Sequence, residues 1–443
     1  MKINMPENAN RIIHTLNDAG YEAYIVGGCV RDAILGKEPD DWDITTSAKP
    51  EDVKRLFDRT IDTGIAHGTV TVMFGKEGYE VTTYRVDGEY TDHRRPDKVT
   101  FTSELVEDMK RRDFTINAMA YNDADGLVDK FDGVKDLEAH IIRCVGEPSE
   151  RFDEDALRIL RAVRFSAQLD FEIEDRTKES IRKQAKFLKD ISAERIQVEL
   201  TKLLMSDHPE KLIDAYELGV TAIILPEFDV MMETPQINKH HAYSVGEHTI
   251  KVVENVPKDK VLRLAALLHD VAKPTTKTND GQWDHFYGHN EAGVEMAGKI
   301  LKRLKYDNAT ISRVKRLVLW HDFGMGGLPK IKTFRRSLSK MGEDLFEDFT
   351  YIKRADILAQ SEFQREEKLE RLEALKGYYD EVISNNQCIS LKDLAITGSD
   401  LIALGMKPGK EIGEVLNGLL DMVIDDPSLN DKDKLIEIFN NRK

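Results

Sequence analysis

Residues 27–45 read GGCVRDAILGKEPDDWDIT and follow the short apolar run EAYIV at 22–26. An apolar run that ends in glycine is typical of a buried strand passing into a turn. Two glycines there let backbone N–H groups approach a ligand closely, and Arg31 follows at the start of the next helix. The stretch predicts a strand, a ligand-binding loop that includes Gly28, and a helix.

Asp41 and Asp43 make this prediction more specific. In a strand, residues i and i+2 share one face about 7 Å apart, so both carboxylates can converge on one divalent cation. Oxygen ligands at this spacing suit Mg²⁺ that bridges a triphosphate. A solvated acidic turn is the alternative for the DxD pattern alone. The glycines and Arg31 shortly before it favour a nucleotide site.

The composition describes a large acidic globular protein. The chain has 443 residues, 41% hydrophobic and 33% charged, and this length suggests two to four domains. The formal net charge of -16 argues against a protein that coats nucleic acid nonspecifically. A local basic groove is still compatible with it, because an RNA backbone contacts a patch of surface.

We expect a cytoplasmic protein. Cys29, Cys144 and Cys388 are far apart and form no CxxC motif, so they are predicted to be thiols in a reducing compartment. The N-terminal MKINMPENANRII lacks the apolar segment of a signal peptide. No run approaches the roughly 18 apolar residues of a membrane span.

Strand and helix patterns predict an α+β head followed by an all-α remainder. Period-two alternation predicts strands at 42–46, 69–75 and 79–85. The polar segment VDGEYTDHRRPDK at 86–98 is typical of a loop. After about residue 145 the strand signals stop, and helical periodicity predicts helices at 151–168, 192–205 and 363–384.

Residues 153–165, DEDALRILRAVRF, predict a helix with a charged stripe. Every third residue from 155 is charged, which places these residues on one slowly drifting face: Asp155, Arg158, Arg161 and Arg164. A helix surface with intrahelical salt bridges is one explanation. Binding of a polar ligand is the other.

Several motifs together resemble a known family. GG…RD followed by DxD resembles the polymerase-β nucleotidyltransferase superfamily. The later runs resemble the class II CCA-adding enzymes, also called tRNA nucleotidyltransferases, in order and spacing: RRDFTINAMA (111–120), DGVKDL (132–137) and FDEDALRILRAVRF (152–165). The resemblance covers the whole chain. It implies transfer of CMP, CMP and AMP from CTP and ATP to the 3′ end of tRNA without a nucleic-acid template.

The resemblance also implies an organisation into four parts. These are a nucleotidyltransferase head with a mixed sheet and helices at 1–142, a helical neck with a base-recognition helix at 143–230, an HD metal-binding domain at 231–362, and a helical tRNA-binding tail at 363–443. The predicted partners are tRNA, CTP and ATP, with no membrane and no particular oligomeric state.

The resemblance implies that Asp41 and Asp43 hold two Mg²⁺ ions, one activating the tRNA 3′-hydroxyl and one neutralising the triphosphate. A third carboxylate is expected on a neighbouring strand. Glu80 is the candidate, and an ordinary charge on an edge strand is the alternative reading of it.

Nucleotide contacts are implied for a second group of head residues. Gly28 and Arg31 belong to the loop after the first strand. Arg112 and Asp113 resemble the motif that contacts the sugar and selects ribose through its 2′-hydroxyl. Asn117 belongs to the same motif, although it could equally be structural.

Asp155 and Arg158 resemble the pair that selects the base in this family. Cytosine and adenine each offer an exocyclic amine beside a ring-nitrogen acceptor, so a carboxylate can accept from the amine and a guanidinium can donate to the ring. Uracil and guanine present a carbonyl and an N–H there, which would leave a buried carboxylate unpaired. Arg161 and Arg164 lie further along the stripe, where phosphate oxygens are plausible partners.

The loop at 86–98 bears on which nucleotides are added. In this family, the flexible element after the third-carboxylate strand is needed for the terminal A. Its presence, with Arg94 and Arg95, favours full CCA addition or addition of A alone, and the sequence leaves both open.

A second constellation follows in the order H…HD…H…H…D. Its members are His248, His269, Asp270, His289, His321 and Asp356. The runs LLHDVAKP (267–274), YGHNEAG (287–293) and RADILAQ (354–360) resemble the HD-superfamily metal phosphohydrolases. Imidazole with carboxylate suits a transition metal such as Mn, Ni, Fe or Zn. Lys273 could contact a phosphate.

This HD set suggests a second activity, hydrolysis of phosphomonoesters or 2′,3′-cyclic phosphates. A metal site kept for stability, or a domain without turnover, is the alternative. The tail run ITGSDLIALGMKPGKEIGEVL (396–416) predicts a helix, a tight turn and another helix, with Lys407 and Lys410 near the turn. The resemblance implies that this end contacts the tRNA elbow; a small helical cap is the structural alternative.

Three rival functions remain at this stage. The first is an enzyme that adds only A or, less plausibly, only CC. The second is a bacterial poly(A) polymerase, which shares the head; the long tail with GMKPG and the lack of a basic extension in this chain argue against it. The third is a tRNA-binding protein whose working part is an HD phosphohydrolase. The intact DxD argues against the third, since a binding module has no need of adjacent carboxylates.

Overall fold

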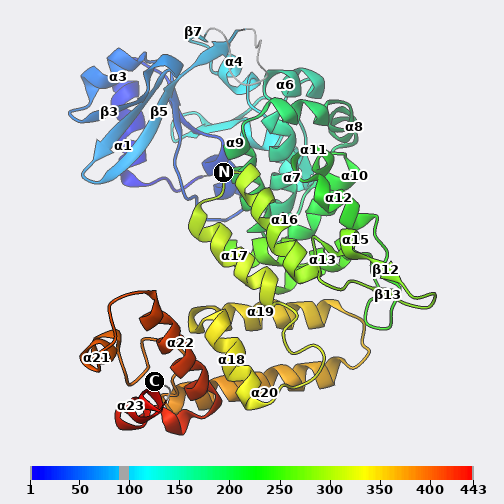
Figure 1. The fold of residues 1–443 in the computed structure, drawn as a ribbon. Helices are drawn as coiled ribbons and strands as arrows, with labels where there is room; N and C mark the ends of the chain where they lie inside the picture. The colour runs from blue at the N-terminus through cyan, green and yellow to red at the C-terminus, as the bar shows by residue number, and fades with distance from the viewer. Residues whose placement is uncertain (1, 89–98, 442–443) are drawn as a thin grey trace. The chain divides into compact units, whose positions relative to one another are not determined.

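The computed structural model describes residues 2–88 and 99–441, and Figure 1 shows its fold. The chain divides into two compact units, Met1–Pro226 and Glu227–Lys443, which are described separately below. Among the described residues, no helix is both long and apolar enough to cross a membrane. The predicted loop at 86–98, with Arg94 and Arg95, lies mostly outside the described residues.

The first unit begins with a seven-stranded mixed sheet, which confirms the predicted head. Its strand order is β3-β4-β5-β2-β1-β8-β9, and only the β2–β5 pairing is parallel. The strands are β1 (Ala23–Val26), β2 (Ile44–Thr46), β3 (Thr60–Gly64), β4 (Thr69–Phe74), β5 (Glu77–Thr83), β8 (Met119–Asn122) and β9 (Gly126–Asp129). A separate antiparallel pair consists of β6 (Arg85–Asp87) and β7 (Val99–Phe101).

Short helices accompany the sheet: α1 (Glu7–Asp18), α2 (Gly28–Ile34), α3 (Pro50–Leu56), α4 (Leu105–Lys110) and α5 (Gly133–Glu138). Helix α1 buries Ile12, Ile13 and Leu16 and contacts β1 and β2 (Figure 1). Its apolar residues recur at helical spacing, which is why one face packs on the sheet.

The predicted strand at 42–46 is shorter in the structure. Strand β2 begins at Ile44, so Asp41 and Asp43 lie just before the strand and not within it. Val26 donates its N–H to the Asp43 carbonyl at 3.0 Å, but β1 ends there and Gly27 turns away with φ +84°. The residues before Asp43 therefore lack a neighbouring β1 strand to extend the ladder.

Helices make up the rest of the first unit: α6 (Pro148–Glu154), α7 (Leu157–Leu169), α8 (Asp175–Gln184), α9 (Ala193–Leu204), α10 (Leu212–Glu217) and α11 (Thr221–Ile224). A two-residue parallel pair, β10 (Ile141–Ile142) with β11 (Glu172–Ile173), lies among them. The predicted helix at 192–205 is confirmed as α9, which packs along α7.

The predicted continuous helix through 153–165 is wrong, because it is broken at Asp155. Helix α6 ends at Glu154, and Asp155 has extended backbone angles (φ -144°, ψ 101°). Its carboxylate oxygen Oδ1 accepts the N–H of Leu157, the first residue of α7, at 3.1 Å. An acidic side chain that accepts a free N–H at a helix start competes with helix continuation, which explains the break.

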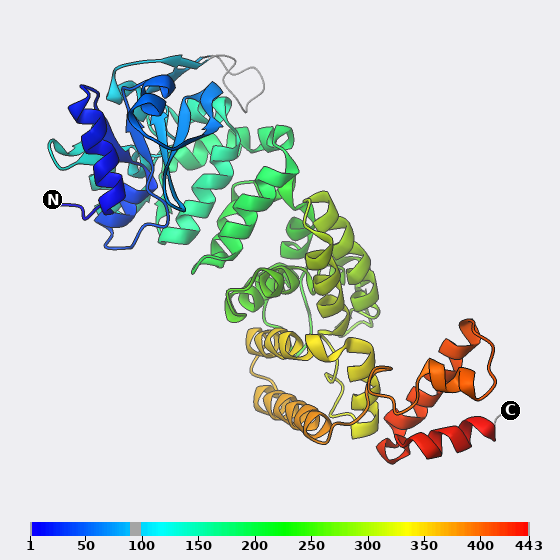
Figure 2. The same cartoon turned by 90° about the vertical axis from the view of Figure 1, so that its left-hand side faces the viewer.

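The second unit is helical apart from the hairpin β12 (Thr278–Asn279) and β13 (Asp284–His285), as predicted. Its helices, after α12 (Pro226–Met232) at the boundary, are α13 (Val245–Asn255), α14 (Lys260–Leu268), α15 (Lys273–Thr276), α16 (His289–Arg303), α17 (Asn308–Trp320), α18 (Ile331–Met341), α19 (Glu343–Ala359), α20 (Arg365–Ser384), α21 (Gly398–Ala403), α22 (Lys410–Asp425) and α23 (Lys432–Asn440). Figures 1 and 2 show α19 and α20 side by side.

Two sequence predictions for the tail are confirmed. The charged stretch at 363–384 forms α20, and the run at 396–416 forms α21, a turn and the start of α22. The tail has a small core of its own, which includes Leu401, Leu419, Val423 and Phe439.

A buried ion pair joins α7 to α9. Arg164 Nε lies 2.6 Å from Glu199 Oε2, and the two side chains are 7% and 6% exposed. The Arg164 guanidinium also stacks on the Phe165 ring, 3.7 Å from its centroid. A buried charge that loses its partner costs far more than the intact pair contributes.

We therefore expect Glu199→Ala to lower the free energy of unfolding by about 3–5 kcal/mol. The double variant Arg164→Met with Glu199→Leu should recover most of this loss, since no charge is then left alone. Urea unfolding followed by circular dichroism measures both. The control is Glu179→Ala, which removes the exposed partner of Lys183 on α8. Unchanged stability of Glu199→Ala would contradict the argument.

Candidate functional site

The head carboxylates lie where β2 and β5 begin their parallel pairing. Ile44 pairs with Val81, so the preceding residues, Asp43 and Glu80, are neighbours across the two strands. Glu80 is exposed on β5, which lies between β4 and β2 and is therefore not an edge strand. The structure thus brings the candidate third carboxylate beside the DxD motif.

These carboxylates act on one another electrostatically. Desolvation raises the pKa of Asp43, Arg112 opposes this, and the negative charges of Glu80 and Asp41 raise it further. Asp41, Asp43 and Glu80 are not among the groups of three or more potential ligands within 4.8 Å found in the described residues. They form an open set of like charges at the surface, an arrangement that a cation would stabilise.

The glycine loop after β1 is shaped around Arg112. Gly27 has φ +84°, and a Cβ placed there would lie 2.9 Å from Arg112 Nη1. Gly28 begins α2, and a Cβ there would lie 3.7 Å from Arg31 Nη2. The loop therefore needs glycine at position 27 both for its backbone angle and for the close approach of Arg112.

Arg31, Asn117 and Asp113 form one buried chain of hydrogen bonds. Arg31 Nη1 donates to Asn117 Oδ1 at 2.6 Å, and Asn117 Nδ2 donates to Asp113 Oδ1 at 3.2 Å. Arg161 Nε donates to Asp113 Oδ2 at 2.7 Å. Burial alone would raise the pKa of Asp113, but Arg161 and Arg158 lower it to about 2. In this structure Asn117 therefore links charged groups within the fold.

Two arginines of the charged stripe on α7 form ion pairs with carboxylates from other segments. Arg161 contacts Asp113, and Arg164 contacts Glu199 from α9. Their contact with nucleotide phosphates stays a prediction. Glu199 has no role in the sequence analysis, because a polar residue on a helix does not reveal its partner on another helix.

Asp155 and Arg158 each have partners of their own. Arg195, at the start of α9, donates from Nη1 to Asp155 Oδ1 at 3.1 Å and from Nη2 to Oδ2 at 2.6 Å. Arg158 donates to the carbonyls of Arg151 at 3.1 Å and Arg111 at 2.8 Å, and it pairs with Glu154. Sequence reasoning missed Arg195, and the only available signal was its position at a predicted helix start.

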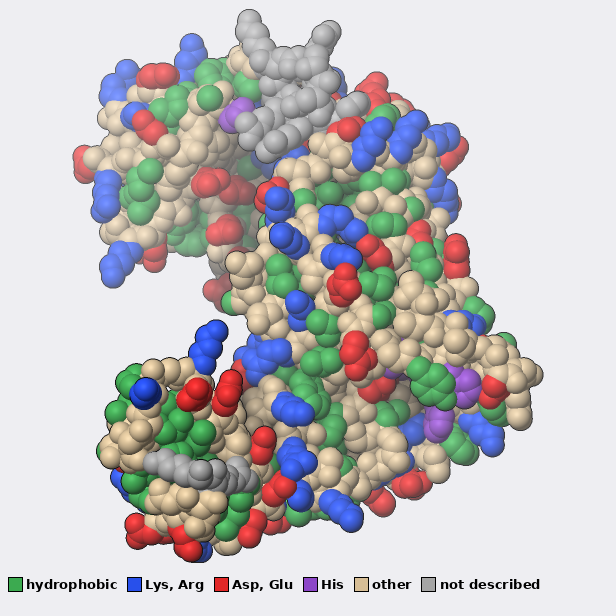
Figure 3. Space-filling view, viewed as in Figure 1, with side chains coloured by type: hydrophobic (Ala, Val, Ile, Leu, Met, Phe, Trp, Pro, Cys, Tyr) green, Lys and Arg blue, Asp and Glu red, His purple; other side chains and the backbone are tan. Residues whose placement is uncertain are grey.

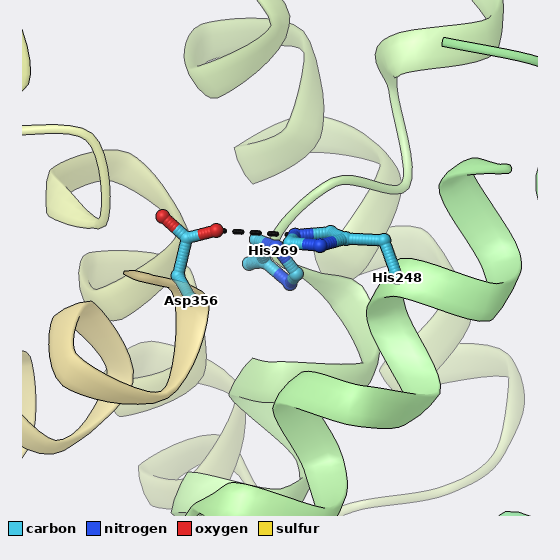
Figure 4. A group of neighbouring side chains, drawn as sticks. All are labelled: His248, His269 and Asp356. Atoms are coloured by element: carbon cyan, nitrogen blue, oxygen red, sulfur yellow. Dashed lines mark ion pairs between the residues drawn. The ribbon is translucent and has the colours of Figure 1, made fainter. Parts of the chain in front are cut away.

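In the second unit, two triads of metal-ligand types lie together. Figure 4 shows the first, His248, His269 and Asp356, with His248 Nε2 3.1 Å from Asp356 Oδ1. The second triad is Asp270, His289 and His321, and all six residues are buried. Three separate regions, α13, the end of α14 and α19, supply the first triad.

Asp270 faces both triads. Its Oδ2 lies 3.2 Å from His269 Nε2 and 3.7 Å from His248 Nε2. Its Oδ1 lies 3.5 Å from His289 Nε2 and 3.6 Å from His321 Nε2. These oxygens are in ionic contact, with Lys273 Nζ 2.7 Å from Oδ2, but within the described residues neither makes a hydrogen bond of regular geometry, and neither does Nε2 of His248 or His269. Buried polar atoms without well-formed hydrogen bonds are typical of a ligand site.

The histidine rings are oriented with Nε2 toward the centre. Nδ1 lies 2.7 Å from a backbone carbonyl in His269 (Ala266), His289 (Phe286) and His321 (Val318). Because a carbonyl can only accept, Nδ1 carries a proton in each ring, and Nε2 is the ring atom directed to the cluster. Nitrogen and carboxylate donors of this kind fit a transition metal.

Charged groups surround this cluster. Lys273 Nζ lies 2.7 Å from Asp270 Oδ2, and Gln360 Nε2 donates to both oxygens of Asp356 at 3.0 Å. Asp322 lies 3.2 Å from His289 and 3.5 Å from His321. Asp322 was not among the residues predicted from the sequence, although the second His-Asp dipeptide, at 321–322, was a signal for it.

An open cavity of about 390 Å³ leads to the cluster. It is lined by Asp270, His289 and His321 and, further out, by His285 and Tyr287. Figure 3 shows histidine side chains at the surface of the second unit near the β12–β13 hairpin. The cluster is therefore accessible to a small polar ligand.

Three family models match the chain. They are described as "Poly A polymerase head domain" (residues 23–143), "Probable RNA and SrmB- binding site of polymerase A" (170–232) and "tRNA nucleotidyltransferase domain 2 putative" (275–439). The matches fall on the sheet with its glycine loop, on the helices after α7, and on most of the second unit.

Relatives match nearly the whole chain. The CCA-adding enzyme of Lactobacillus helveticus is 37% identical over 424 residues, 96% of this chain and 94% of the relative. The structure of the Bacillus stearothermophilus CCA-adding enzyme in complex with CTP superposes with a TM-score of 0.71 at 28% identity, covering 99% of each chain. The Thermotoga maritima CCA-adding enzyme complexed with tRNA shares the fold (TM-score 0.62, 21% identity). The chain therefore belongs to the family of class II CCA-adding enzymes with a polymerase-β-type head.

Proposed function

We propose that this chain adds CCA to the 3′ end of tRNA from CTP and ATP, and that Asp41 and Asp43, with Glu80, form its catalytic centre. The observation that carries the proposal is the set of like charges where β2 begins to pair with the middle of β5, beside Arg112 and the glycine loop. The CTP, ATP and tRNA complexes of related enzymes support the same substrates. The rival poly(A) polymerase is disfavoured by the near-complete match to CCA-adding enzymes.

The three carboxylates supply oxygen donors that fit Mg²⁺. When bound, Mg²⁺ would neutralise the triphosphate and the leaving pyrophosphate and favour deprotonation of the attacking 3′-hydroxyl. Arg112 lies beside Asp43 and the glycine loop, where it can bind a phosphate or sugar oxygen of the incoming nucleotide. Gly28 and Arg31 form the start of α2 next to it.

Asp155 and Arg158 select the base in this proposal. A carboxylate accepts from the exocyclic amine of C or A, and a guanidinium donates to the neighbouring ring nitrogen. The helix break at Asp155 holds the carboxylate at the start of α7, three residues before Arg158. The Arg161 and Arg164 contacts with Asp113 and Glu199 would fix α7 during selection.

A basic face of the first unit is the candidate contact for the tRNA backbone. Figure 3 shows Lys and Arg side chains gathered over α6 and α8. On α8 and the following turn the exposed ones are Arg176, Arg182, Lys183, Lys186 and Lys189. A chain with net charge -16 needs such a local patch to bind RNA. In the tail, exposed Lys407 and Lys410 are the candidates for a contact with the tRNA elbow.

We also propose that the chain is organised into four parts. The division into head (1–142), neck (143–230), HD domain (231–362) and tail (363–443) is supported by a boundary between compact units at 226/227 and by the separate tail core. A cytoplasmic location is supported by Cys29, Cys144 and Cys388, which are all free and buried.

Asp41→Ala and Asp43→Ala should each abolish extension, because each removes a metal ligand. Labelled CTP and ATP, supplied with tRNAs that end before CCA, after C and after CC, measure this. Asp40→Ala is the matched control, since Asp40 is a neighbouring exposed carboxylate. Full activity of Asp41→Ala would refute the assignment. Extension of only the CC-ending tRNA by the unmodified chain would show that it adds A alone.

Asp155→Ala should reduce the preference for CTP over UTP by about tenfold or more, because the acceptor for the amine is lost. Primer-extension competition between the two nucleotides measures the ratio. Mg²⁺-dependent activity with CTP should remain detectable, since Asp41 and Asp43 are untouched. A discrimination ratio equal to that of the unmodified chain would rule out base reading by Asp155.

A second function is proposed for the HD residues: metal-dependent hydrolysis of phosphomonoesters or 2′,3′-cyclic phosphates. The observation that favours it is the convergence of buried Nε2 and carboxylate atoms of the two triads, next to an open cavity. A bound transition metal would supply Lewis-acid activation of a phosphoryl group and of water. Lys273 and Asp322 would set the charge around the phosphate. A purely structural metal site is the alternative.

The full chain should therefore bind Mn²⁺ or Ni²⁺, and the two triads allow up to two ions. Asp270→Ala should lose most of this metal and any hydrolysis of 2′,3′-cyclic AMP, because Asp270 faces both triads. Metal analysis after desalting and a phosphate-release assay measure these effects. Asp421→Ala, at an exposed position on α22, is the control. Metal binding without hydrolysis would leave the structural role, and no binding would refute the site.

A further inference from the structure

Arg195 forms a bidentate ion pair with Asp155. Its Nη1 and Nη2 donate to Oδ1 and Oδ2 at 3.1 and 2.6 Å, which is the parallel geometry in which guanidinium and carboxylate are held most rigidly. Arg195 is the third residue of α9, and Asp155 is the residue at which α6 and α7 are separated. The two side chains are 27% and 18% exposed, so the pair is only partly open to solvent.

The contacts leave one acceptor position on Asp155. A carboxylate offers about four lone-pair sites, two on each oxygen. Oδ1 accepts from Arg195 and from the N–H of Leu157, so it is fully used. Oδ2 accepts from Arg195 alone. The position that remains for a ligand N–H is therefore on Oδ2.

Arg195 is itself held in place. Glu199, four residues later on α9, forms the buried ion pair with Arg164 on α7. Helices α7 and α9 pack along each other, so the start of α9 is fixed relative to the start of α7. The ion pair between Arg195 and Asp155 thus connects two elements that cannot easily drift apart.

We propose that Arg195 is a specificity-determining positioning residue: it holds Asp155 as a fixed carboxylate that can only accept, with one open position for the base amine. This inference rests on the proposed base-reading role of Asp155. A carboxylate that only accepts pairs with the amine of C or A and opposes the carbonyl of U or G. A carboxylate that could rotate would no longer keep this acceptor position aimed at the base, so the mismatch with the carbonyl of U or G would be relieved. Loss of Arg195 therefore weakens rejection of U and G more than it weakens use of C.

The test measures the CTP-over-UTP incorporation ratio and kcat and KM for CTP, on tRNA ending before CCA. Arg195→Met should lower the ratio by about tenfold, since one lost charged contact in such a site has this size. It should change kcat for CTP less than it changes the ratio. Arg195→Lys should have a ratio between those of Arg195→Met and the unmodified chain, because Lys keeps the charge but not the bidentate geometry.

Arg303→Met is the matched control. Arg303 forms the same kind of bidentate pair with Glu227, at 2.7 Å and 2.7 Å, in the second unit. It should leave the ratio unchanged. In an Asp155→Ala background, Arg195→Met should change the ratio no further, because its effect acts through Asp155.

The outcomes distinguish failure of the role proposed for Arg195 from failure of the base-reading role proposed for Asp155. If Asp155→Ala lowers the ratio but Arg195→Met and Arg195→Lys keep it within about twofold of the unmodified chain, the role of Arg195 is refuted. If Asp155→Ala itself leaves the ratio unchanged, the base-reading function fails and Arg195 with it. If Arg195→Met does not fold, the intermediate ratio expected of Arg195→Lys decides, and a ratio equal to that of the unmodified chain refutes the role.

Discussion

Pairing between two arginines of α7 and two buried carboxylates is the constraint on which the arrangement of the proposed nucleotide site depends. Asp113 comes from the segment after α4 and Glu199 from α9, and they meet Arg161 and Arg164 on the helix between them. Because a buried charge without its partner is very costly, these segments are held in one arrangement. The sheet next to the carboxylates proposed as catalytic and the helices proposed to read the base are thereby connected through charge and not only through apolar packing.

The two proposed metal sites differ in how exposed their carboxylates are. In the head, Asp41, Asp43 and Glu80 stay at the surface, and their mutual repulsion favours an incoming cation with its nucleotide. In the second unit the aspartates are buried, and His269 and Lys273 keep the pKa of Asp270 well below its usual range despite that burial. The first arrangement suits a metal that arrives with substrate, and the second suits a metal that stays with the protein.

Local pattern predicted much of the fold and the types of the site residues, but not their partners. The strands around 69–75 and 79–85, the helix at 363–384 and the helical second unit follow from periodicity within each segment. The break at Asp155 could not be predicted this way, because the residues around it favour helix. Arg195, which pairs with Asp155, lies 40 residues away in sequence. For Asp322 the sequence offered the His-Asp dipeptide at 321–322, but its proximity to His289 exists only after α16 and α17 pack together.

The helix break has a consequence for how such a protein can change over time. The carboxylate proposed to read the base is also the group that accepts the first N–H of α7. A substitution that altered the accepted nucleotides by removing this carboxylate would also weaken the start of the helix. Loss of fidelity and loss of stability are thus inherited together. Substitutions at this position that change which nucleotides are added would therefore be selected against because they destabilise the fold, independently of their effect on the finished tRNA.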